Sequence, residues 1–599
     1  MPDYHAPIED MRFVLNELAG LQDIAQMPGF EEATPDVVDA ILDEAGKLAG
    51  EVLAPLNHIG DRQGCVLENG VVRTPEGFKD AYRQYVQSGW NALPFEPEFG
   101  GQGLPWVVAQ AIQEMWNSAN MSFALCPLLN VGAVELLQVH GSPDQQATYL
   151  PKMVSGEWTG TMNLTEPQAG SDVGAAKTRA VKDGEAYRIT GQKIYITYGE
   201  HDFTDNIVHM VLARTPDAPA GTKGISLFIV PKYLPKEDGS AGERNDLRCV
   251  SIEHKLGINA SPTCTMAYGD NGGAVGFLVG EENRGIEYMF TMMNNARLSV
   301  GVQGVAIAER AYQQALAYAR ERVQGRPVDG SSKQAVPIIR HPDVRRTLMT
   351  MRARTEAARA LAYVTAGALD HARRHPDEAV RRDHQINRLE LLTPVVKAWC
   401  TDLGCEVASQ GMQVHGGMGF IEETGAAQHY RDARITPIYE GTNGIQAMDL
   451  IGRKVLRRKA EPVRDLTADM KQTVERLRGA NGEDLPALGA GLKEAVETVE
   501  KATDWLMEAE ARDPAEPGAG AAPYLDMLGG VTAGWLMARG AEAAARRLAE
   551  NGVGDQRFLR AKIVTARYYA DNLLPHALAS ANSAMKGSKG VLALDEDAF

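Results

Sequence analysis

Residues 163–172 read NLTEPQAGSD and lie where the spacing of apolar residues changes from a helical to a strand pattern. Before them, the run PDVVDAILDEAGKLAGEVLAPL at residues 35–56 has apolar side chains at helical intervals. After them come AYRIT, KIYIT, NIVHMVLA, ISLFIV and TCTMAY, separated by turn-forming segments such as DG and DNGG. Pro167 and Gly170 make the junction itself a loop. The chain therefore passes from helices into strands at this point.

The helical pattern returns after the strands, and this defines the domain organisation that we predict. Long segments such as NNARLSVGVQGVAIAERAYQQALAYARERV are helical, and the last part of the chain is rich in Ala, Leu and Glu. We predict an α+β multidomain protein with an N-terminal extension (1–34), an N-terminal helical domain (35–159), a central β domain (160–282), a helical domain (283–455) and an additional C-terminal helical domain (456–599). The amphipathic helices of the last domain could face a partner or a membrane, but packing on the body is the simpler interpretation.

Composition excludes several classes of protein. The 599 residues carry a formal charge of −17, which argues against nucleic acid or an anionic membrane as a partner. The six cysteines form no CxxC pair and no Cys/His cluster, so we expect reduced thiols and no metal site. The N-terminus MPDYHAPIED lacks the features of a targeting signal, and we expect a cytoplasmic protein without an integral membrane segment.

Two segments near the first strands offer groups suited to a planar redox ring. Thr165 and Ser171 supply hydroxyls in the junction loop, although such a loop could simply cap a neighbouring element. Tyr195 and Thr197 are two residues apart on a strand and so share a face, where a ring and a hydroxyl could form one wall of a site. A half-buried strand without function explains the same pattern.

The third segment, at residues 413–446, combines a glycine-rich loop with a carboxylate. Gly416, Gly417 and Gly419 allow the backbone to approach a pyrophosphate, although such a loop alone is a weak signal. Residues 439–442 read YEGT, which places Glu440 beside a glycine and a hydroxyl. A lone glutamate in a loop is usually solvated, so the argument depends on the three segments together.

Together these segments resemble the acyl-CoA dehydrogenase family over about residues 35–455. The family's LTEP-x-AGSD, K-x-WIT, R-x-QFG, Q-x-x-GG and YEGT signatures occur in order, with some changes. The two extensions resemble a longer bacterial branch that includes 3-methylmercaptopropionyl-CoA dehydrogenases. The resemblance implies a β-barrel-like middle domain, a four-helix bundle after it, and FAD as the cofactor.

The resemblance also implies a role for individual residues. It assigns the following to FAD binding: Met162, Leu164, Thr165, Ser171, Tyr195, Thr197, Arg322, Gln413, Gly416, Gly417 and Thr442. It assigns the following to substrate binding: Ser171, Asn294, Arg297 and Gly441. The sequence departs from the family where Tyr195 replaces a tryptophan, Asn294 an aspartate and Gly444 a glutamine, and where the aromatic residue after Arg322 is missing.

The implied reaction is the α,β-dehydrogenation of an acyl-CoA thioester to the trans-2-enoyl-CoA. Glu440 would remove the α-proton while a hydride leaves Cβ for flavin N5. Some relatives carry the base immediately before the arginine of the long helix, and that position is Ala296 here. Short thioether-containing, medium and long acyl chains all remain open as substrates.

The resemblance further implies partners. Each flavin would be completed by Arg322 of a second copy, which indicates a homodimer, and the electron acceptor would be an electron-transfer flavoprotein. An acyl-CoA oxidase that uses O₂ shares the same site residues. A non-catalytic flavoprotein that uses its C-terminal helices as a scaffold is a further alternative, against which the presence of Glu440 argues.

Overall fold

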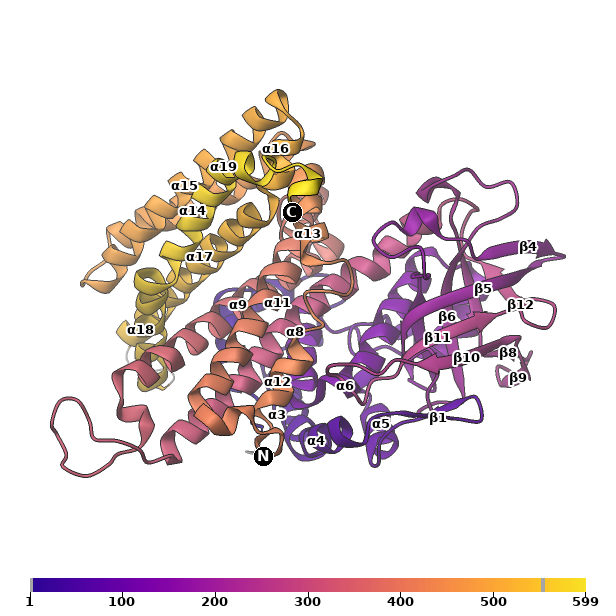
Figure 1. The fold of residues 1–599 in the computed structure, drawn as a ribbon, viewed down its shortest axis with the longest axis horizontal. Helices are drawn as coiled ribbons and strands as arrows, with labels where there is room; N and C mark the ends of the chain where they lie inside the picture. The colour runs from indigo at the N-terminus through magenta and orange to yellow at the C-terminus, as the bar shows by residue number, and fades with distance from the viewer. Residues whose placement is uncertain (1–3, 551–554) are drawn as a thin grey trace. The chain divides into compact units, whose positions relative to one another are not determined.

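The computed structural model describes residues 4–550 and 555–599 and divides into two compact units (Figure 1). Unit 1 comprises Met1–Asp43, Pro105–Glu114 and Val300–Phe599, and unit 2 comprises Glu44–Leu104 and Met115–Ser299. Along the chain, helices are followed by strands, by helices again and by a further set of C-terminal helices. This order confirms the predicted fold class. The exact domain boundaries stay predictions.

Among residues 4–550 and 555–599, all the strands lie in unit 2, together with several helices. Its helical elements are η1 (Leu48–Leu53), α4 (Ala54–Gln63), α5 (Phe78–Gln87), η2 (Trp90–Ala92), η3 (Pro97–Phe99), most of α6 (Trp106–His140), α7 (Pro143–Val154), η4 (Val173–Ala175), η5 (Thr222–Gly224) and the first part of α8 (Gly285–Glu321). Its strands are β1 (Val66–Glu68), β2 (Val71–Arg73), β3 (Trp158–Asn163), β4 (Arg179–Asp183), β5 (Ala186–Thr197), β6 (Asn206–Ala213), β7 (Ser226–Pro231), β8 (Tyr233–Pro235), β9 (Ala241–Arg244), β10 (Leu247–Ile252), β11 (Thr263–Tyr268) and β12 (Ala274–Leu278).

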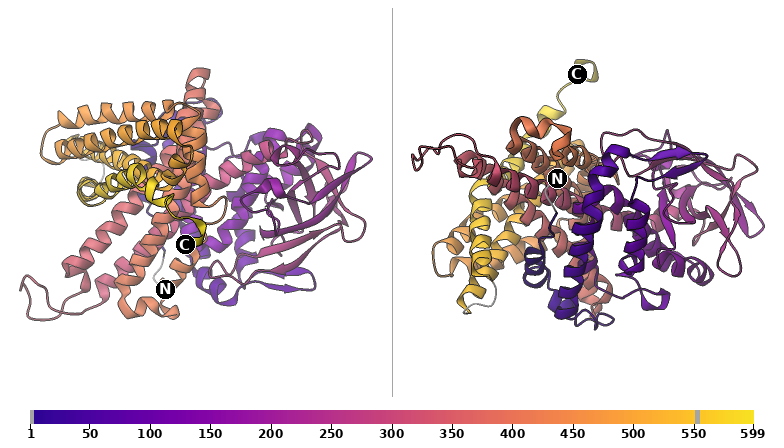
Figure 2. Two further views of the ribbon diagram at one scale, coloured as in Figure 1. Left: turned by 45° about the horizontal axis from the view of Figure 1, so that its top comes forward. Right: turned by 90° about the horizontal axis from the view of Figure 1, so that it is seen from below.

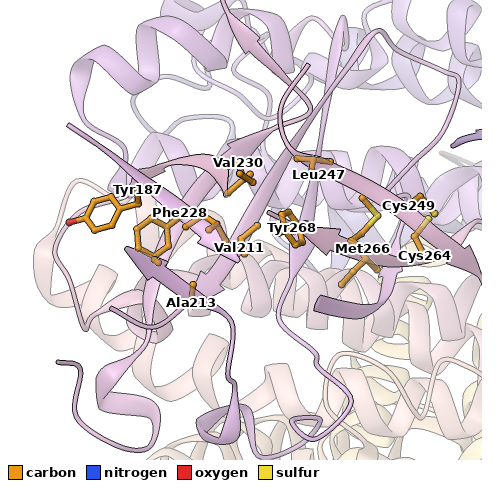
Figure 3. Packing of buried hydrophobic residues seen from close by; sticks show 14 of the residues in the cluster. Tyr187, Val211, Ala213, Phe228, Val230, Leu247, Cys249, Cys264, Met266 and Tyr268 are labelled. Carbon is orange, nitrogen blue, oxygen red and sulfur yellow. The ribbon is translucent and has the colours of Figure 1, made fainter. Parts of the chain in front are cut away.

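One sheet of eight strands organises unit 2. Its order is β10-β11-β5-β12-β7-β6-β3, with β4 paired to β5, and only β3 and β6 run parallel. Figure 3 shows the apolar core on this sheet, where Tyr187 of β5 packs with Phe228 and Val230 of β7, and Met266 and Tyr268 of β11 extend the cluster. β5 and β10 alternate between buried and exposed residues, as expected where one face of a sheet is covered, whereas every residue of β3, β6 and β7 is buried.

Strand β5 unites two runs that look separate in the sequence. AYRIT and KIYIT belong to one strand of 12 residues, because Gly191 and Gln192 continue the pairing with β11. Gly191 is required for close packing: a Cβ atom at this position would lie 2.6 Å from Oγ1 of Thr178. The single strand links the junction loop to the middle of the sheet.

Helix α6 is the most apolar long helix. By length and composition it meets the criteria for a membrane span, with a mean hydropathy of 1.5 over its most apolar window. However, 89% of that window is buried within the protein, and the helix is broken at Asn120, whose φ and ψ are −158° and 91°. The Asn120 side chain accepts a hydrogen bond from the N–H of Phe123 at 3.1 Å and so caps the second part. These are the properties of a core helix.

The regular elements that the structure describes in unit 1 are helices, joined by turns and loops. Its elements are α1 (Ile8–Glu17), α2 (Leu21–Ile24), most of α3 (Pro35–Lys47), the second part of α8, η6 (Ile338–Arg340), α9 (Pro342–Arg374), α10 (Glu378–Asp383), η7 (His384–Leu389), α11 (Glu390–His415), η8 (Gly416–Phe420), η9 (Glu422–Thr424), α12 (Ala426–Ala433), α13 (Asn443–Asp449), η10 (Leu450–Leu456), α14 (Glu461–Arg478), α15 (Asp484–Arg512), α16 (Ala515–Ala519), α17 (Ala521–Ala549), α18 (Gln556–Asn572), α19 (Leu574–Val591) and η11 (Glu596–Ala598).

Helices α8 and α11 cross closely at glycines. A Cβ atom at Gly304 would lie 2.2 Å from the carbonyl oxygen of Cys400, and one at Gly404 would lie 2.7 Å from the carbonyl oxygen of Gly304. Any side chain at these positions would force the helices apart. The close approach therefore holds α11, which leads into the glycine-rich loop, firmly against α8.

The C-terminal helices pack on the rest of unit 1. In Figures 1 and 2 the orange-to-yellow helices α14, α15, α17 and α19 lie alongside one another. The indole N–H of Trp535 on α17 donates to Thr473 Oγ1 of α14 at 2.9 Å, and Phe13 of α1 packs against Ala543 and Ala544 of α17. The structure therefore supports the simpler interpretation of their amphipathic faces, which pack inside the unit.

A buried arginine joins four helices of unit 1. Arg359 of α9 is 1% exposed and donates to Asp10 of α1 at 2.6 Å, Glu114 of α6 at 2.6 Å and Glu309 of α8 at 2.7 Å. The planar guanidinium has enough donors to serve all three carboxylates at once. The cation in turn stabilises all three carboxylates, because a buried charge without a partner is strongly destabilising.

A buried lysine connects the C-terminal domain to the same cluster. Lys562 of α18 donates to Asp10 at 2.6 Å and to Glu356 of α9 at 2.7 Å. Burial alone would raise the pKa of the Asp10 carboxyl, but Lys562 and Arg359 together hold it at about 2. Asp10 therefore stays ionised and ties the N-terminal helix to a helix near the other end of the chain.

Candidate active site

The junction loop of residues 163–172 is held against β5 by backbone hydrogen bonds. The carbonyl of Thr165 accepts from the N–H of Ile194 at 2.9 Å, and Glu166 and Ala169 exchange two backbone bonds across the loop. Thr165 is half-buried and Ser171 is exposed. The loop thus presents both hydroxyls from a compact, paired backbone.

A buried ion pair locks this loop to the strand. Lys193 Nζ lies 2.8 Å from Glu166 Oε1 and donates to the carbonyl of Leu164 at 3.0 Å. Glu166 also accepts from the N–H groups of Lys177 and Thr178 and from the Thr178 hydroxyl. Burial alone would raise the pKa of Glu166, but Lys193 and these hydrogen bonds hold it at about 2. The carboxylate is therefore ionised and structural.

A β-bulge in β5 determines which way Tyr195 faces. Lys193 pairs with Met266 and Ile196 with Cys264, so Ile194 and Tyr195 together lie opposite a single residue of β11. Buried positions are odd-numbered before the bulge and even-numbered after it, from Lys193 to Ile196. The bulge therefore turns Tyr195 away from the core.

Tyr195 carries the backbone strain of this bulge. Its φ is +60°, a conformation that non-glycine residues rarely adopt, and its side chain is 61% exposed. Thr197 follows on the same outward side and is half-buried, while its carbonyl accepts from Thr161 Oγ1 at 2.7 Å. A strained residue that exposes an aromatic ring is typical of a binding site.

Glu440 lies in a strained turn of unit 1. Its φ is +56°, and the following Gly441 has a φ of +84°. A left-handed conformation costs a non-glycine residue about 1–2 kcal/mol, so the surrounding contacts must hold it. Thr442 ends the turn as the N-cap of α13, where its hydroxyl accepts from the N–H of Ile445 at 3.3 Å.

Side chains anchor the residues on both sides of this turn. The buried Tyr439 hydroxyl donates to Gln303 Oε1 of α8. Burial raises the pKa of the Tyr439 phenol well above its ordinary value, so it acts as a neutral donor. Asn443 accepts from Lys397 Nζ at 2.8 Å and donates to Thr401 Oγ1 of α11 at 3.0 Å. The turn is therefore fixed at each end to a long helix.

The glycine-rich loop leaves open space in front of its backbone. Helix α11 ends at His415, and Gly416 continues with a φ of +60°. A Cβ atom at Gly416 or at Gly417 would meet no atom within 4 Å, whereas one at Gly419 would lie 2.1 Å from the carbonyl oxygen of Met412. Gly419 closes the loop against the helix, and Gly416, Gly417 and the exposed Gln413 remain available to a ligand.

The remaining predicted residues lie on α8 and just after it. Asn294 is exposed and Arg297 is 4% exposed, with its guanidinium 5.9 Å from the centre of the Phe290 ring. Ala296 is buried. Arg322 is exposed at the start of an arm in which Val323 bridges to Pro337.

The predicted residues are divided between the two units. Unit 2 carries Met162, Leu164, Thr165, Ser171, Tyr195, Thr197, Asn294 and Arg297, and unit 1 carries Arg322, Gln413, Gly416, Gly417, Glu440, Gly441 and Thr442. Within unit 2, the Glu166–Lys193 pair brings the junction loop and β5 together. We did not predict this pair, although both residues lie inside the signatures that define the resemblance.

Comparison with known proteins identifies the family. Family models for the acyl-CoA dehydrogenase N-terminal, middle and C-terminal domains match residues 39–157, 161–270 and 283–456. A model described as acetyl-CoA dehydrogenase C-terminal like matches residues 466–595. The chain belongs to the acyl-CoA dehydrogenase family. As a member of that family it is an acyl-CoA dehydrogenase.

Curated relatives span the whole chain. The chain is 52% identical to a 3-methylmercaptopropionyl-CoA dehydrogenase of Ruegeria pomeroyi, over 95% of this chain and 96% of the relative. It is 34% identical to a butyryl-CoA dehydrogenase of Syntrophomonas wolfei, over 100% and 99%. An acyl-CoA dehydrogenase of Bacillus anthracis, solved in complex with FAD, has the same fold, with a TM-score of 0.73, 23% identity and coverage of 98% and 92%. The predicted resemblance to this family is confirmed.

The Glu166–Lys193 pair leads to a test of stability. We expect Glu166→Gln to lower the free energy of unfolding by about 3–5 kcal/mol at pH 7, because it leaves Lys193 buried without a counter-charge. The folded-state pKa of Glu166, about 2, lies below the unfolded value of about 4.3. Its contribution is therefore complete above pH ~4.3 and is lost as the pH falls toward 2.

Urea unfolding of both proteins at pH 7 and at pH 3 measures the effect, and the difference between them should shrink at the lower pH. Glu157→Gln provides the control, because Glu157 pairs with Lys152 at 2.6 Å but is 56% exposed. That exposed pair should contribute less than ~1 kcal/mol. An equal loss in the two variants would contradict the structural role of the buried pair.

Proposed function

We propose that this protein performs an FAD-dependent α,β-dehydrogenation of an acyl-CoA thioester, with Glu440 as the catalytic base. The observation that carries the proposal is the YEGT turn. A carboxylate is placed there by a strained backbone that two long helices anchor. Strain of this kind persists only where the surroundings over-determine it, and it is concentrated at active sites.

The residues present fit FAD. An exposed aromatic ring at Tyr195 with a hydroxyl at Thr197 suits one wall of a planar ring system. The open backbone at Gly416 and Gly417 suits a pyrophosphate, because a glycine loop allows close approach of N–H groups. Together with Thr165, these residues would hold the cofactor. FAD, when bound, supplies the acceptor for the hydride that leaves Cβ.

The chain's own groups supply the acid–base chemistry. The Glu440 carboxylate takes the proton from Cα, which is acidified by the adjacent thioester carbonyl. The N–H of Glu440 donates to that carbonyl oxygen as negative charge develops on it. Arg297, whose planar guanidinium suits phosphate or adenine, would recognise CoA together with Asn294, Ser171 and Gly441.

We propose 3-methylmercaptopropionyl-CoA as the substrate, because the relative of that name shares 52% of its residues with this chain over nearly its full length. We expect the highest kcat/KM for this thioester in a panel that also contains butyryl-CoA and palmitoyl-CoA. A selectivity of ~10-fold or more over butyryl-CoA is expected, because the thioether sulfur inserted between Cβ and the terminal methyl lengthens the chain by one atom and makes it more polarisable. A higher kcat/KM for palmitoyl-CoA would favour fatty-acid oxidation instead.

We propose an electron-transfer flavoprotein as the electron acceptor, following the family resemblance, and a cytoplasmic location. Rapid reoxidation of the reduced enzyme by air would instead identify an oxidase. The acceptor assignment concerns the step after substrate oxidation. It leaves the role of Glu440 unchanged.

We propose a homodimer in which Arg322 completes the site of a second copy. The arm that begins at Arg322 is exposed and includes Val328, whose side chain is 80% exposed in the single chain. Light scattering of the FAD-loaded protein should give twice the 64.9 kDa mass of the chain. We expect Arg322→Ala to lower FAD retention while Arg326→Ala, on the same exposed arm, does not. A monomer with full flavin content would contradict the proposal.

The decisive test concerns the base itself. Glu440→Gln keeps the shape of the side chain but removes its ability to accept the α-proton. We expect the rate of flavin reduction by substrate under anaerobic conditions to fall at least ~10²-fold, the scale of general-base catalysis. FAD absorbance and acyl-CoA binding should be retained, and they provide the internal control. Near wild-type reduction by this variant would show that the base lies elsewhere.

A further inference from the structure

A glutamine to which the family resemblance assigns no role holds the turn that carries Glu440. Gln446 lies on α13 and is fully buried. Its Nε2 donates to the carbonyl oxygen of Glu440 at 3.2 Å and to that of Gly441 at 3.2 Å. A single side-chain amide therefore holds two consecutive peptide groups, and these belong to the two residues with positive φ.

The oxygen atom of the same amide indicates the role of Gln446. Gln446 Oε1 is buried and has no hydrogen-bond partner within the described part of the chain. The reverse orientation would place this oxygen against two carbonyl oxygens, so the contact with the turn determines how the amide lies. A buried acceptor without a partner is unfavourable. The hydrogen bonds that Nε2 donates to the turn are therefore the interactions that this buried amide makes.

The neighbouring anchors act on other atoms of the loop. Tyr439 is fixed through its hydroxyl to Gln303, and Asn443 through its amide to Lys397. These contacts position the ends of the turn. Gln446 acts on the peptide groups that follow Glu440 and Gly441, and the first of these restricts the backbone rotation at Glu440 that sets the direction of its side chain.

We propose that Gln446 is a positioning residue for the catalytic base. By donating to the carbonyls of Glu440 and Gly441, it keeps Glu440 in the left-handed conformation and so aims the carboxylate at the α-hydrogen. This inference rests on the proposed function, in which Glu440 removes that proton. A displacement of a catalytic group by about 1 Å can reduce a rate by about 10²-fold, so a modest relaxation of the turn is sufficient to matter.

Two substitutions separate the donor function from packing. Gln446→Met has nearly the same length and volume but cannot donate. Gln446→Glu has the same shape, accepts only when ionised and regains one donor when protonated. A matched control is Gln314→Met, because Gln314 is 2% exposed, donates to the carbonyl of Thr424 at 2.7 Å and lies outside the assigned site residues.

The experiment uses the FAD-loaded full-length protein with 3-methylmercaptopropionyl-CoA or butyryl-CoA, whichever the wild type oxidises faster. Exchange of the α-hydrogens with D₂O, followed by mass spectrometry, reports proton abstraction. Anaerobic stopped-flow absorbance reports flavin reduction. Titrations of FAD and of acyl-CoA report binding, and thermal unfolding checks the fold.

We expect Gln446→Met to reduce α-hydrogen exchange and flavin reduction by about 10- to 100-fold, while both dissociation constants change by less than about 3-fold. The ratio of the rate of Gln446→Glu to that of Gln446→Met should rise as the pH is lowered from 9 to 6. Titration of Glu440 is common to both variants and largely cancels in this ratio. Gln314→Met should react at the wild-type rate.

Several outcomes would overturn the inference. These are a wild-type rate in Gln446→Met, an equal loss in Gln314→Met, or a loss explained by weaker binding. If Gln446→Met does not fold, Gln446→Glu decides: a rate ratio to wild type that does not change with pH overturns the inference. If Glu440→Gln still exchanges α-hydrogens, the proposed function fails and the role of Gln446 fails with it. An inactive Glu440→Gln beside a fully active Gln446→Met overturns only this inference.

Discussion

The buried contact of Arg359 with three carboxylates is the constraint on which the helical unit depends. Asp10, Glu114 and Glu309 come from three different helices, and none of them is stable in an apolar interior without a cation. The helices must therefore meet at one place and in one orientation. Apolar side chains alone would allow more arrangements, because their contacts are not directional. The cluster fixes α8, which is the helix to which Tyr439 anchors one end of the Glu440 turn.

The strained site residues of the two units are held in the same way. In each, a non-glycine residue is kept at positive φ, and polar contacts behind it maintain that conformation. Tyr195 is turned outward by the bulge in β5, beside a strand position where Lys193 is paired with Glu166. Glu440 is held by Gln446 on α13. In both places the residue expected to meet a ligand is the strained one, and its support is fully buried.

Periodicity and motifs predicted a large part of this molecule. Changes in apolar spacing located the strands and the helices around them, and the YEGT motif led to Glu440. The geometry of the site could not be predicted in the same way. The outward direction of Tyr195 depends on a bulge whose position is set by pairing with β11, so alternation within β5 alone would have turned it inward. Likewise, AYRIT and KIYIT form one strand because Gly191 and Gln192 pair with β11, a strand that lies about 70 residues later in the chain.

The buried charge clusters of unit 1 that sequence reasoning missed join residues that are far apart in the chain. Arg359 reaches carboxylates 50, 245 and 349 positions away, and Lys562 donates to Asp10 across 552 positions. This last pair has a consequence for synthesis on the ribosome. The first helix emerges early, but Asp10 can pair with Arg359 only after more than half of the chain has been made, and with Lys562 only when almost the whole chain has been made. Completion of the helical unit is therefore a late, post-translational event, and nascent chains that stop short of α18 leave the first helix without that partner.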